Sequence, residues 1–449
     1  MDQPRGAFVG RVEMLRSLRS WLTGEVRAAA LPSIGSISGS AGIGKTFLLD
    51  HALRETDTRA RRYVTLRVAA TSVLPTLAGV VMDLTANVRT PTQKKVEFAR
   101  VGECRGALEW MDSRAREEVE REVAEDSGLP KSVAEIYALA RGLVQFVPLP
   151  QAQLAARIAG MVEPKHVEKV VRLIQKAAAY QTEKAPRLSG RGDVKLRNHL
   201  RTELGETLAR ALVDDLEREL VGGFPFRRDV GERGRLLLII DDYERLADVA
   251  GEFLLRHLVP QLAAAPFESL VLQLGRDRLV DTDPGWRQHC QQHLLGDLVL
   301  SELSSEEAIQ YVQSRGITDP EKVNRIVRDT AGYPYLLESE VDDEIHGQSS
   351  ALSRELFFER TTQWMSPQQK TWAIRLAFLT EISLERIPRV LPNENAEAVL
   401  AWFKRESSLR APTADRWSMR PMIRSKLQEY VRNDSPAKFA ELEKIAAGD

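Results

Sequence analysis

The stretch Gly39-Ser40-Ala41-Gly42-Ile43-Gly44-Lys45-Thr46 decides the fold of this chain. It matches the pattern G-x-x-x-x-G-K-[ST], with a strand-like segment, SIGSIS, before it and a helix-like segment, KTFLLDHALRE, from Lys45 onward. Glycines let backbone N–H groups point inward around phosphate oxygens, and the following helix adds its positive N-terminal end. Lys45 can reach the β- and γ-phosphates, and the Thr46 hydroxyl can ligate Mg²⁺. The stretch therefore predicts a phosphate-binding loop that holds a nucleotide and Mg²⁺.

Strand patterns alternate with helix patterns around this loop. Apolar segments at 33–38, 61–70, 236–240 and 270–274 are typical of strands. The segment 236–240 is an unbroken aliphatic run, as expected when both faces of a strand are covered. This alternation predicts an α/β fold with a parallel, doubly wound sheet. Residues 1–80 and 225–298 are assigned to this P-loop NTPase core.

A long helical insertion separates the second strand from the third. Residues 81–224 show helical periodicity and few strand signals, and the segment is too long for a simple crossover. Within it, residues 136–162 are unusually apolar and are interrupted by Val147-Pro148-Leu149-Pro150. We interpret this part as a helical hairpin that folds back on the domain. A hairpin that touches a membrane or a partner is the alternative.

The C-terminal third of the chain carries mainly helical patterns. Residues 299–350 are assigned to a helical lid, which opens on a Ser N-cap in SSEEAIQYV. Residues 351–435 contain three helix patterns, a hairpin pattern with its turn at 412–415, and a further helix from Pro421. Three helices and a hairpin predict a winged-helix domain. Residues 436–449 are assigned to a tail.

Two acidic positions follow the third strand, and a third lies nearby. A carboxylate at the carboxyl end of a buried strand is placed where a Mg²⁺ ligand must be, so Asp241 is assigned to the metal, through water. Asp242 is the candidate that polarises the attacking water, and Glu244 is its competitor. Acidic turns are common, so these acids indicate a nucleotide site only because the chain also contains the phosphate-binding loop.

An arginine ends the fourth strand. Arg276 could contact the γ-phosphate and sense its presence, and the competing interpretation is a surface arginine in a loop. The chain has no Asn-Lys-x-Asp sequence of the kind that reads guanine. ATP or ADP is therefore the expected nucleotide.

Taken together, these motifs resemble the STAND class of AAA+-related ATPases, which includes NB-ARC, NACHT and bacterial regulator ATPases. Phe8-Val9-Gly10-Arg11 resembles the N-terminal motif whose backbone brackets the adenine in that class, and LLLIIDDYERLAD resembles its Walker B segment. Arg276 falls where the class has its sensor-1 arginine. The resemblance implies a nucleotide-binding role for Val9, Gly10 and Arg11 and for the loop at 39–46.

The same resemblance extends to the lid and the winged helix. Gly332-Tyr333-Pro334 resembles the Gly-x-Pro of the lid, whose proline packs near the nucleotide. Met419-Arg420-Pro421 stands where the class has Met-His-Asp, whose histidine contacts the β-phosphate of ADP. Arg420 is the corresponding candidate here, and the substitution leaves in doubt how the ADP state is held. The sequence has no long repeat sensor, so either it is a fragment, or the insertion or a partner protein supplies the sensing.

Composition indicates the partners and the cellular environment that we expect for this protein. The 449 residues carry a formal net charge of −1, which offers no global attraction to nucleic acid or to an anionic membrane. The two cysteines, Cys104 and Cys290, have no metal-ligand spacing and fit a reducing, cytoplasmic environment. We expect no secretory signal and no membrane span.

Two functions compete at this stage. The leading one is a slow, regulatory ATP hydrolase: ADP holds a closed monomer, and ATP favours an open form that assembles into a homo-oligomer and answers to an unidentified protein trigger or effector. The alternative is a DNA-binding ATPase, since origin-recognition ATPases also join this core to a winged helix. Residues 366–432 hold 12 basic and 7 acidic residues, which favours DNA. The helix pattern at 395–406 offers few outward basic side chains, which disfavours base reading.

Overall fold

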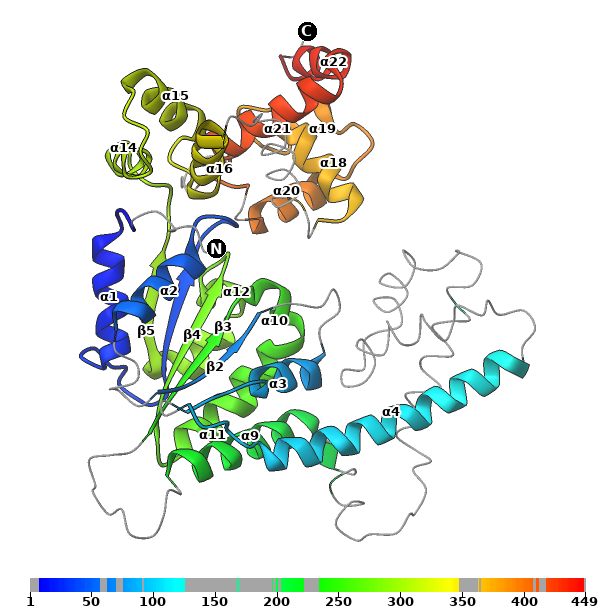
Figure 1. Ribbon diagram of the computed structural model, residues 1–449. Coiled ribbons are helices and arrows are strands. Elements are labelled where there is room, and N and C mark those ends of the chain that lie inside the picture. The colour runs from blue at the N-terminus through cyan, green and yellow to red at the C-terminus, as the bar shows by residue number, and fades with distance from the viewer. Residues whose placement is uncertain are drawn as a thin grey trace.

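The computed structural model describes residues 8–56, 63–69, 76–90, 93–125, 168, 196, 199–200, 203–221, 234–346, 362, 365–406, 409–411 and 417–447. They form an α/β core, a three-helix lid and a C-terminal helical domain (Figure 1). The apolar stretch 136–162 and the turn at 412–415 lie outside these residues. Within the described part of the chain, no helix has the length and apolarity needed to cross a membrane.

The core contains a five-stranded sheet in which every neighbouring pair is parallel. In chain order the strands are β1 Ser33–Ser38, β2 Tyr63–Val68, β3 Arg235–Ile240, β4 Glu268–Gly275 and β5 Leu294–Val299. Their spatial order is β2-β3-β4-β1-β5. The predicted parallel α/β fold is confirmed, and β5 is an additional strand that the sequence patterns did not reveal.

The strand order places three functional strand ends side by side. Strand β4 lies between β1, which leads into the phosphate-binding loop, and β3, which leads into Asp241. Because parallel strands end at the same edge of a sheet, the residues that follow β1, β4 and β3 gather at one edge. This is the edge that faces the lid and the C-terminal domain in Figure 1.

Helices cover both faces of the sheet. One face packs against α1 Val12–Thr23 and α2 Lys45–Glu55. The other is covered by α3 Leu77–Thr85, α9 Leu204–Leu220, α10 Tyr243–Glu252, η1 Phe253–Leu258, α11 Val259–Ala264, α12 Leu279–Thr282 and α13 Gly285–Cys290. The short helix η2 Gln291–His293 follows α13 and leads into β5. Strand β3 alternates between the two, since Leu236 and Leu238 pack on one side and Leu237 and Ile239 on the other. Burial of both faces accounts for its unbroken aliphatic sequence.

The described ends of the insertion pack as part of the core. Helices α3 and α9 bury apolar side chains in the same cluster as β2 and β3. Helix α4, Ala99–Glu125, begins against α9, where the buried carboxylate of Asp215 accepts hydrogen bonds from the backbone N–H groups of Arg100 and Val101. Further along, α4 extends away from the sheet (Figure 1). The insertion therefore starts from a fixed platform on the core.

The lid consists of α14 Ser305–Ser314, α15 Pro320–Thr330 and α16 Pro334–His346. Ser304 and Glu307 form a reciprocal capping box at the start of α14, as the SSEE sequence predicts. A separate apolar cluster holds the three helices together and includes Ala308, Val312, Val323, Ile326, Leu337 and Val341. The lid is thus a small unit with its own core.

The C-terminal domain has the predicted winged-helix arrangement. It contains α18 Pro367–Leu376, α19 Ile387–Val390, α20 Ala396–Arg405, an antiparallel bridge between Arg410 and Met419, and α21 Pro421–Asp434. The segment assigned to a tail forms a further helix, α22 Pro436–Ala447. Its Phe439 and Leu442 are buried against Phe378 and Val431, so this helix is packed onto the domain.

Candidate nucleotide-binding site

The loop between β1 and α2 has the backbone of a phosphate cradle. Gly42 and Gly44 adopt φ angles of +76° and +91°, which L side chains rarely adopt. A Cβ atom on Gly42 would also lie 2.9 Å from Cβ of Tyr335, on the lid. Glycine at this position therefore allows both the turn and the close approach of the lid.

Lys45 lies at the bottom of this loop, at the start of α2. Its Nζ donates hydrogen bonds to the carbonyl oxygens of Gly39 at 2.8 Å and Ser40 at 3.1 Å. Burial lowers the pKa of Lys45, because the charged form is desolvated, although Glu244 opposes this effect. A buried ammonium held by carbonyl oxygens is a strong site for an anion, since a phosphate would supply the missing opposite charge.

Thr46 and Asp241 meet at the position predicted for Mg²⁺. The Thr46 hydroxyl donates to Oδ2 of Asp241 at 2.9 Å, and Oδ1 of Asp241 accepts from the backbone N–H of Asp242 at 3.0 Å. A hydroxyl and a carboxylate are the hard oxygen ligands that Mg²⁺ prefers. These two residues fit the metal, which would join the protein to the phosphate oxygens.

Asp242 and Glu244 lie in different electrostatic settings. Asp242 has a φ angle of +52° at the N-cap of α10, and its pKa is raised by burial and by the neighbouring carboxylates of Asp241 and Glu244. Glu244 accepts a hydrogen bond from Nε of Arg276 at 2.9 Å. Both acids line the same cavity as Lys45. The raised pKa favours Asp242 as a proton acceptor, whereas Glu244 has only its Oε1 atom paired with Arg276 and keeps Oε2 without a hydrogen-bond partner among the described residues.

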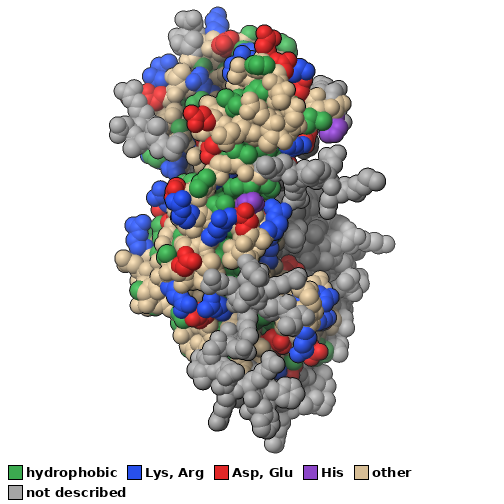
Figure 2. Space-filling view, turned by 60° about the vertical axis from the view of Figure 1, so that its left-hand side comes forward, with side chains coloured by type: hydrophobic (Ala, Val, Ile, Leu, Met, Phe, Trp, Pro, Cys, Tyr) green, Lys and Arg blue, Asp and Glu red, His purple; other side chains and the backbone are tan. Residues whose placement is uncertain are grey.

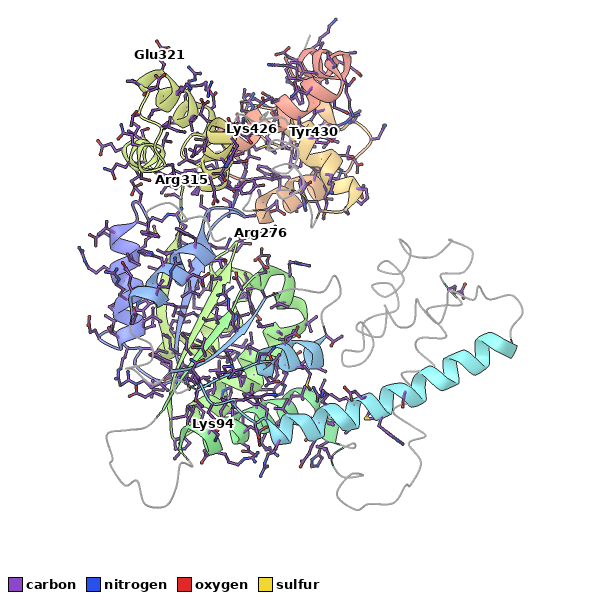
Figure 3. All side chains as sticks on the ribbon, in the orientation of Figure 1. Lys94, Arg276, Arg315, Glu321, Lys426 and Tyr430 are labelled. Carbon is purple, nitrogen blue, oxygen red and sulfur yellow. The ribbon has the colours of Figure 1, made fainter. Side chains whose placement is uncertain are left out.

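Arg276 joins the core to the C-terminal domain (Figure 3). Its side chain, only 6% exposed, binds Glu244 through Nε, and its Nη1 lies 3.2 Å from Oε1 of Glu406. Glu406 is the C-cap of α20, a helix of the winged-helix domain. The sequence places Arg276 at the γ-phosphate, whereas in this structure it is not among the residues that line the cavity.

The cavity lies between the core and the lid and measures about 530 Å³, a size typical of small-molecule sites. Its charged end is formed by the loop and the acids that follow β3. Its other end is lined by side chains of the N-terminal segment and the lid, namely Phe8, Val9, Arg11, Leu303, Tyr311, Pro334, Tyr335, Leu337 and Glu338. Phosphates would occupy the charged end, and the largely apolar end suits an adenine ring.

The lid contacts the loop through Tyr333, the position that the Gly-x-Pro motif leaves unspecified. The hydroxyl of Tyr333 donates to the carbonyl oxygen of Ala41 within the loop. Gly332 has a φ of +72°, and a Cβ atom there would collide with the backbone oxygen of Leu303, only 2.1 Å away. The Gly-Tyr-Pro sequence signalled Pro334, which does line the cavity. Tyr333 stands beside it and holds the lid against the loop.

Arg11 connects the N-terminal segment to both the loop and the lid. Its Nη2 donates to the carbonyl oxygens of Ile43 at 2.5 Å and Ser301 at 3.1 Å, and its backbone N–H donates to Glu307 at 3.0 Å. Burial lowers the pKa of Arg11 to about 10, against the opposing charges of Glu307 and Glu302. Hydrophobic side chains gather at this junction of core and lid in Figure 2.

Arg420 lies outside the residues that line the cavity. Its Nη1 is 2.9 Å from Oε1 of Glu302, and its Nε donates to the carbonyl oxygen of Arg410 at 3.1 Å. The side chain is only 15% exposed, so it does not extend into solvent. The structure thus pairs Arg420 with the linker that precedes the lid, and its predicted contact with phosphate stays a prediction.

The predicted residues fall into three groups. Those that line the cavity are Val9, Arg11, Ala41, Gly42, Gly44, Lys45, Thr46, Asp241, Asp242, Glu244 and Pro334. Gly10, Gly39, Ser40 and Ile43 belong to the surrounding backbone, and Arg276 and Arg420 lie at contacts with other parts of the chain. The structure therefore brings the loop, the strand-end acids and the N-terminal motif into one site.

Comparisons with known proteins find similarity among solved structures. No family model and no curated protein matches the sequence. The chain is similar to the Aeropyrum pernix ORC2 protein solved as ADPNP-ADP complexes, with 14% identity, a TM-score of 0.44, and coverage of 97% of this chain and 98% of that chain. It is also similar to Cdc6p from Pyrobaculum aerophilum, with 11% identity, a TM-score of 0.36, and coverage of 96% and 97%. A third similar structure is the A. pernix ORC1 protein in complex with DNA, with 14% identity, a TM-score of 0.38, and coverage of 95% of this chain and 94% of that chain.

Proposed function

We propose that this protein is an ATP- and ADP-binding regulatory ATPase, related to the AAA+ ATPases, in which the nucleotide controls the contact between the core and the winged-helix domain. The observation that carries this proposal is the position of Arg276. Its buried guanidinium pairs with both Glu244 and Glu406. Glu244 lies at the charged end of the cavity, where the phosphates would bind, and Glu406 belongs to the winged-helix domain. A change in charge beside Glu244 therefore reaches the domain contact through a single side chain.

The γ-phosphate supplies such a change. ADP leaves Arg276 to its two carboxylates, whereas ATP adds a negative group beside Glu244, and repulsion between that group and Glu244 weakens the charge-assisted bond from Glu244 to Arg276. A charge-assisted bond of this kind contributes about 1.5–3 kcal/mol, which corresponds to roughly a ten- to hundredfold shift in a two-state equilibrium. That is enough to change which form predominates when the two forms are close in energy.

Hydrolysis would return the protein to the closed state. Thr46 and Asp241 would hold Mg²⁺, which when bound would supply charge stabilisation to the phosphate oxygens. Lys45 binds the same oxygens from the bottom of the loop, and Asp242 orients the attacking water and accepts its proton. The lid excludes bulk water through the contact of Tyr333 with the loop. Each step uses a residue that lines or closes the cavity.

The order of motifs supports a switch of the STAND type. In that class the open form assembles into a homo-oligomer and passes a signal to a protein partner. The apolar side chains of Val12 and Phe47 are exposed, Phe47 lines the cavity under the lid, and Val12 follows Arg11, which contacts the lid; a change in lid position would alter their surroundings. An oligomeric ATP state is accordingly part of the proposal.

Glu406→Gln tests the shared arginine. Loss of this charge should weaken the closed contact, so the ADP-bound variant should adopt the larger hydrodynamic size that the parent protein shows only with a non-hydrolysable ATP analogue. Size-exclusion chromatography with small-angle scattering measures both forms. Glu397→Gln is the matched control, because Glu397 lies exposed in the first turn of the same helix. Identical profiles for Glu406→Gln and the parent would remove Arg276 as the coupling element.

DNA binding by the winged-helix domain is the second candidate function. It is favoured by the winged-helix arrangement and by the 12 basic residues against 7 acidic ones in 366–432. The outward positions of α20 include Glu397, Ala401 and Lys404, and Lys404 lies over the ring of Trp417 at 5.2 Å. Such a surface suits contacts to the phosphate backbone better than base reading.

Any DNA binding should accordingly be weak and dependent on salt. We expect the affinity for a duplex oligonucleotide, followed by fluorescence anisotropy, to fall at least tenfold between about 50 mM and about 200 mM salt. A sequence-selective footprint that survives the higher salt and is lost on replacing Lys404 and Arg405 would make DNA recognition the primary function. Absence of binding at the lower salt would eliminate this candidate.

A further inference from the structure

The side chain of Arg67 contacts the carboxylate on which the proposed Mg²⁺ site depends. Arg67 lies near the end of β2, beside Ile239 of β3. Its Nη2 is 3.2 Å from Oδ2 of Asp241, and its Nη1 is 2.8 Å from Oδ1 of Asp50 on α2. The same Oδ2 atom of Asp241 accepts the hydrogen bond of Thr46. One carboxylate oxygen therefore serves both the metal-binding hydroxyl and a guanidinium.

We propose that Arg67 lowers the Mg²⁺ affinity of the nucleotide site by competing with the cation for the charge of Asp241. This inference rests on the proposed nucleotide-binding function and adds a control on its metal dependence. Asp50 is the second partner in the arrangement, because it draws the guanidinium toward α2 and away from Asp241. The balance between the two carboxylates sets how much of the charge of Asp241 is available to a cation.

Burial and charge make the competition effective. The side chain of Asp241 is only 9% exposed, so its charge is poorly screened, whereas that of Arg67 is 37% exposed and has room to move. A guanidinium and a divalent cation about 6 Å apart repel each other by an amount that, even in bulk water, corresponds to roughly a tenfold change in affinity. Partial movement of Arg67 into solvent reduces this repulsion, so we expect Arg67 to lower the Mg²⁺ affinity about three- to tenfold.

A purely structural role for Arg67 predicts the opposite result. If Arg67 only oriented Asp241 by bridging it to Asp50, its removal would leave the carboxylate less well placed, and Mg²⁺ would bind more weakly. The competition predicts tighter Mg²⁺ binding after removal. The sign of the change therefore separates the two roles.

The experiment follows a fluorescent ADP analogue bound to the full chain while Mg²⁺ is titrated from an EDTA solution. Arg67→Gln should lower the Mg²⁺ concentration at half-effect about three- to tenfold. Asp50→Asn should raise it, because Arg67 then pairs with Asp241 alone, and should have no effect in the Arg67→Gln background. Arg235→Gln is the matched control, since Arg235 pairs with Glu268 at the opposite end of the same sheet.

The Mg²⁺ midpoint of Arg67→Gln decides whether Arg67 competes with the cation. A higher or unchanged Mg²⁺ midpoint in Arg67→Gln overturns the competition, as does ADP binding that is equally tight with Mg²⁺ and with EDTA in the parent. ADP affinity in EDTA reports whether Arg67→Gln is folded, and if it is not, the direction of the Asp50→Asn shift still decides. No binding of the analogue under any condition would instead contradict the proposed function itself.

Discussion

Replacement of Lys45 by alanine should lower the affinity for both ATP and ADP at least a hundredfold. The ammonium is buried and held by the carbonyl oxygens of Gly39 and Ser40, so it is already positioned where the phosphates would lie. Its loss removes two charge-assisted contacts to phosphate oxygens, each worth about 1.5–3 kcal/mol. Together these correspond to roughly a hundredfold to ten-thousandfold in affinity.

The same substitution should not destabilise the protein without nucleotide. A buried ammonium is costly, as the lowered pKa of Lys45 indicates, so its removal relieves an unfavourable charge. Isothermal titration calorimetry measures the affinity, and thermal unfolding should show an unchanged or higher midpoint that no longer rises with ADP. Arg54→Ala, at the last turn of the same helix, is the control and should bind nucleotide as the parent does. Unchanged ADP affinity in Lys45→Ala would remove the basis of the proposed function.

The sheet could be predicted wherever a strand is covered on both faces. Strand β3 has an unbroken aliphatic run because α2 and α10 lie on its opposite sides, and β4 follows the same rule. Strand β5 carries Gly296 and Asp297 in its middle and lies at the edge of the sheet, with no fully buried residue. Its apolar pattern is therefore too weak to be recognised. The order of the strands depends on pairing, which no local pattern encodes.

The candidate site likewise combines residues that local sequence predicts with contacts that only the packing of distant segments determines. Lys45, Thr46 and Asp241 come together because a loop, a helix start and a strand end are each determined by local sequence and meet at one edge of a parallel sheet. The pair of Arg276 with Glu406 and that of Arg420 with Glu302 span 130 and 118 residues of sequence. Their ion pairs are set by how the C-terminal domain and the linker to the lid pack on the core. A motif places such an arginine in the fold without identifying its partner.

The apolar end of the cavity is the part that sequence reasoning could not separate from ordinary core. Tyr311 and Leu337 follow the helical periodicity of the lid, Leu303 lies just before its first helix, and all three belong to or pack against the lid's own cluster. Such residues are identical in type to those that only pack. Their contribution to the cavity becomes visible only once the lid is placed against the N-terminal segment and the loop.

Asp242→Asn should bind ATP as the parent does but hydrolyse it about a hundredfold more slowly or worse. Asp242 lines the cavity, and burial together with the charges of Asp241 and Glu244 raises its pKa, which makes it a better proton acceptor near neutral pH. Asparagine has the same shape and tolerates the positive φ of this position, so the backbone at the start of α10 should be retained. The change therefore removes the charge and little else.

Glu244→Gln is the comparison that separates the two acids. Its carboxylate is held by Arg276, so this variant should mainly loosen the contact with Glu406 and enlarge the ADP-bound form, with a smaller loss of hydrolysis than in Asp242→Asn. Single-turnover hydrolysis with protein in excess over ATP measures the chemical step without product release, and calorimetry measures ATP affinity in the same samples. If Glu244→Gln abolishes turnover while Asp242→Asn hydrolyses ATP normally, Glu244 orients the water. Arg276 would then act by positioning that carboxylate, and release of Arg276 from Glu406 would couple domain opening directly to the chemical step.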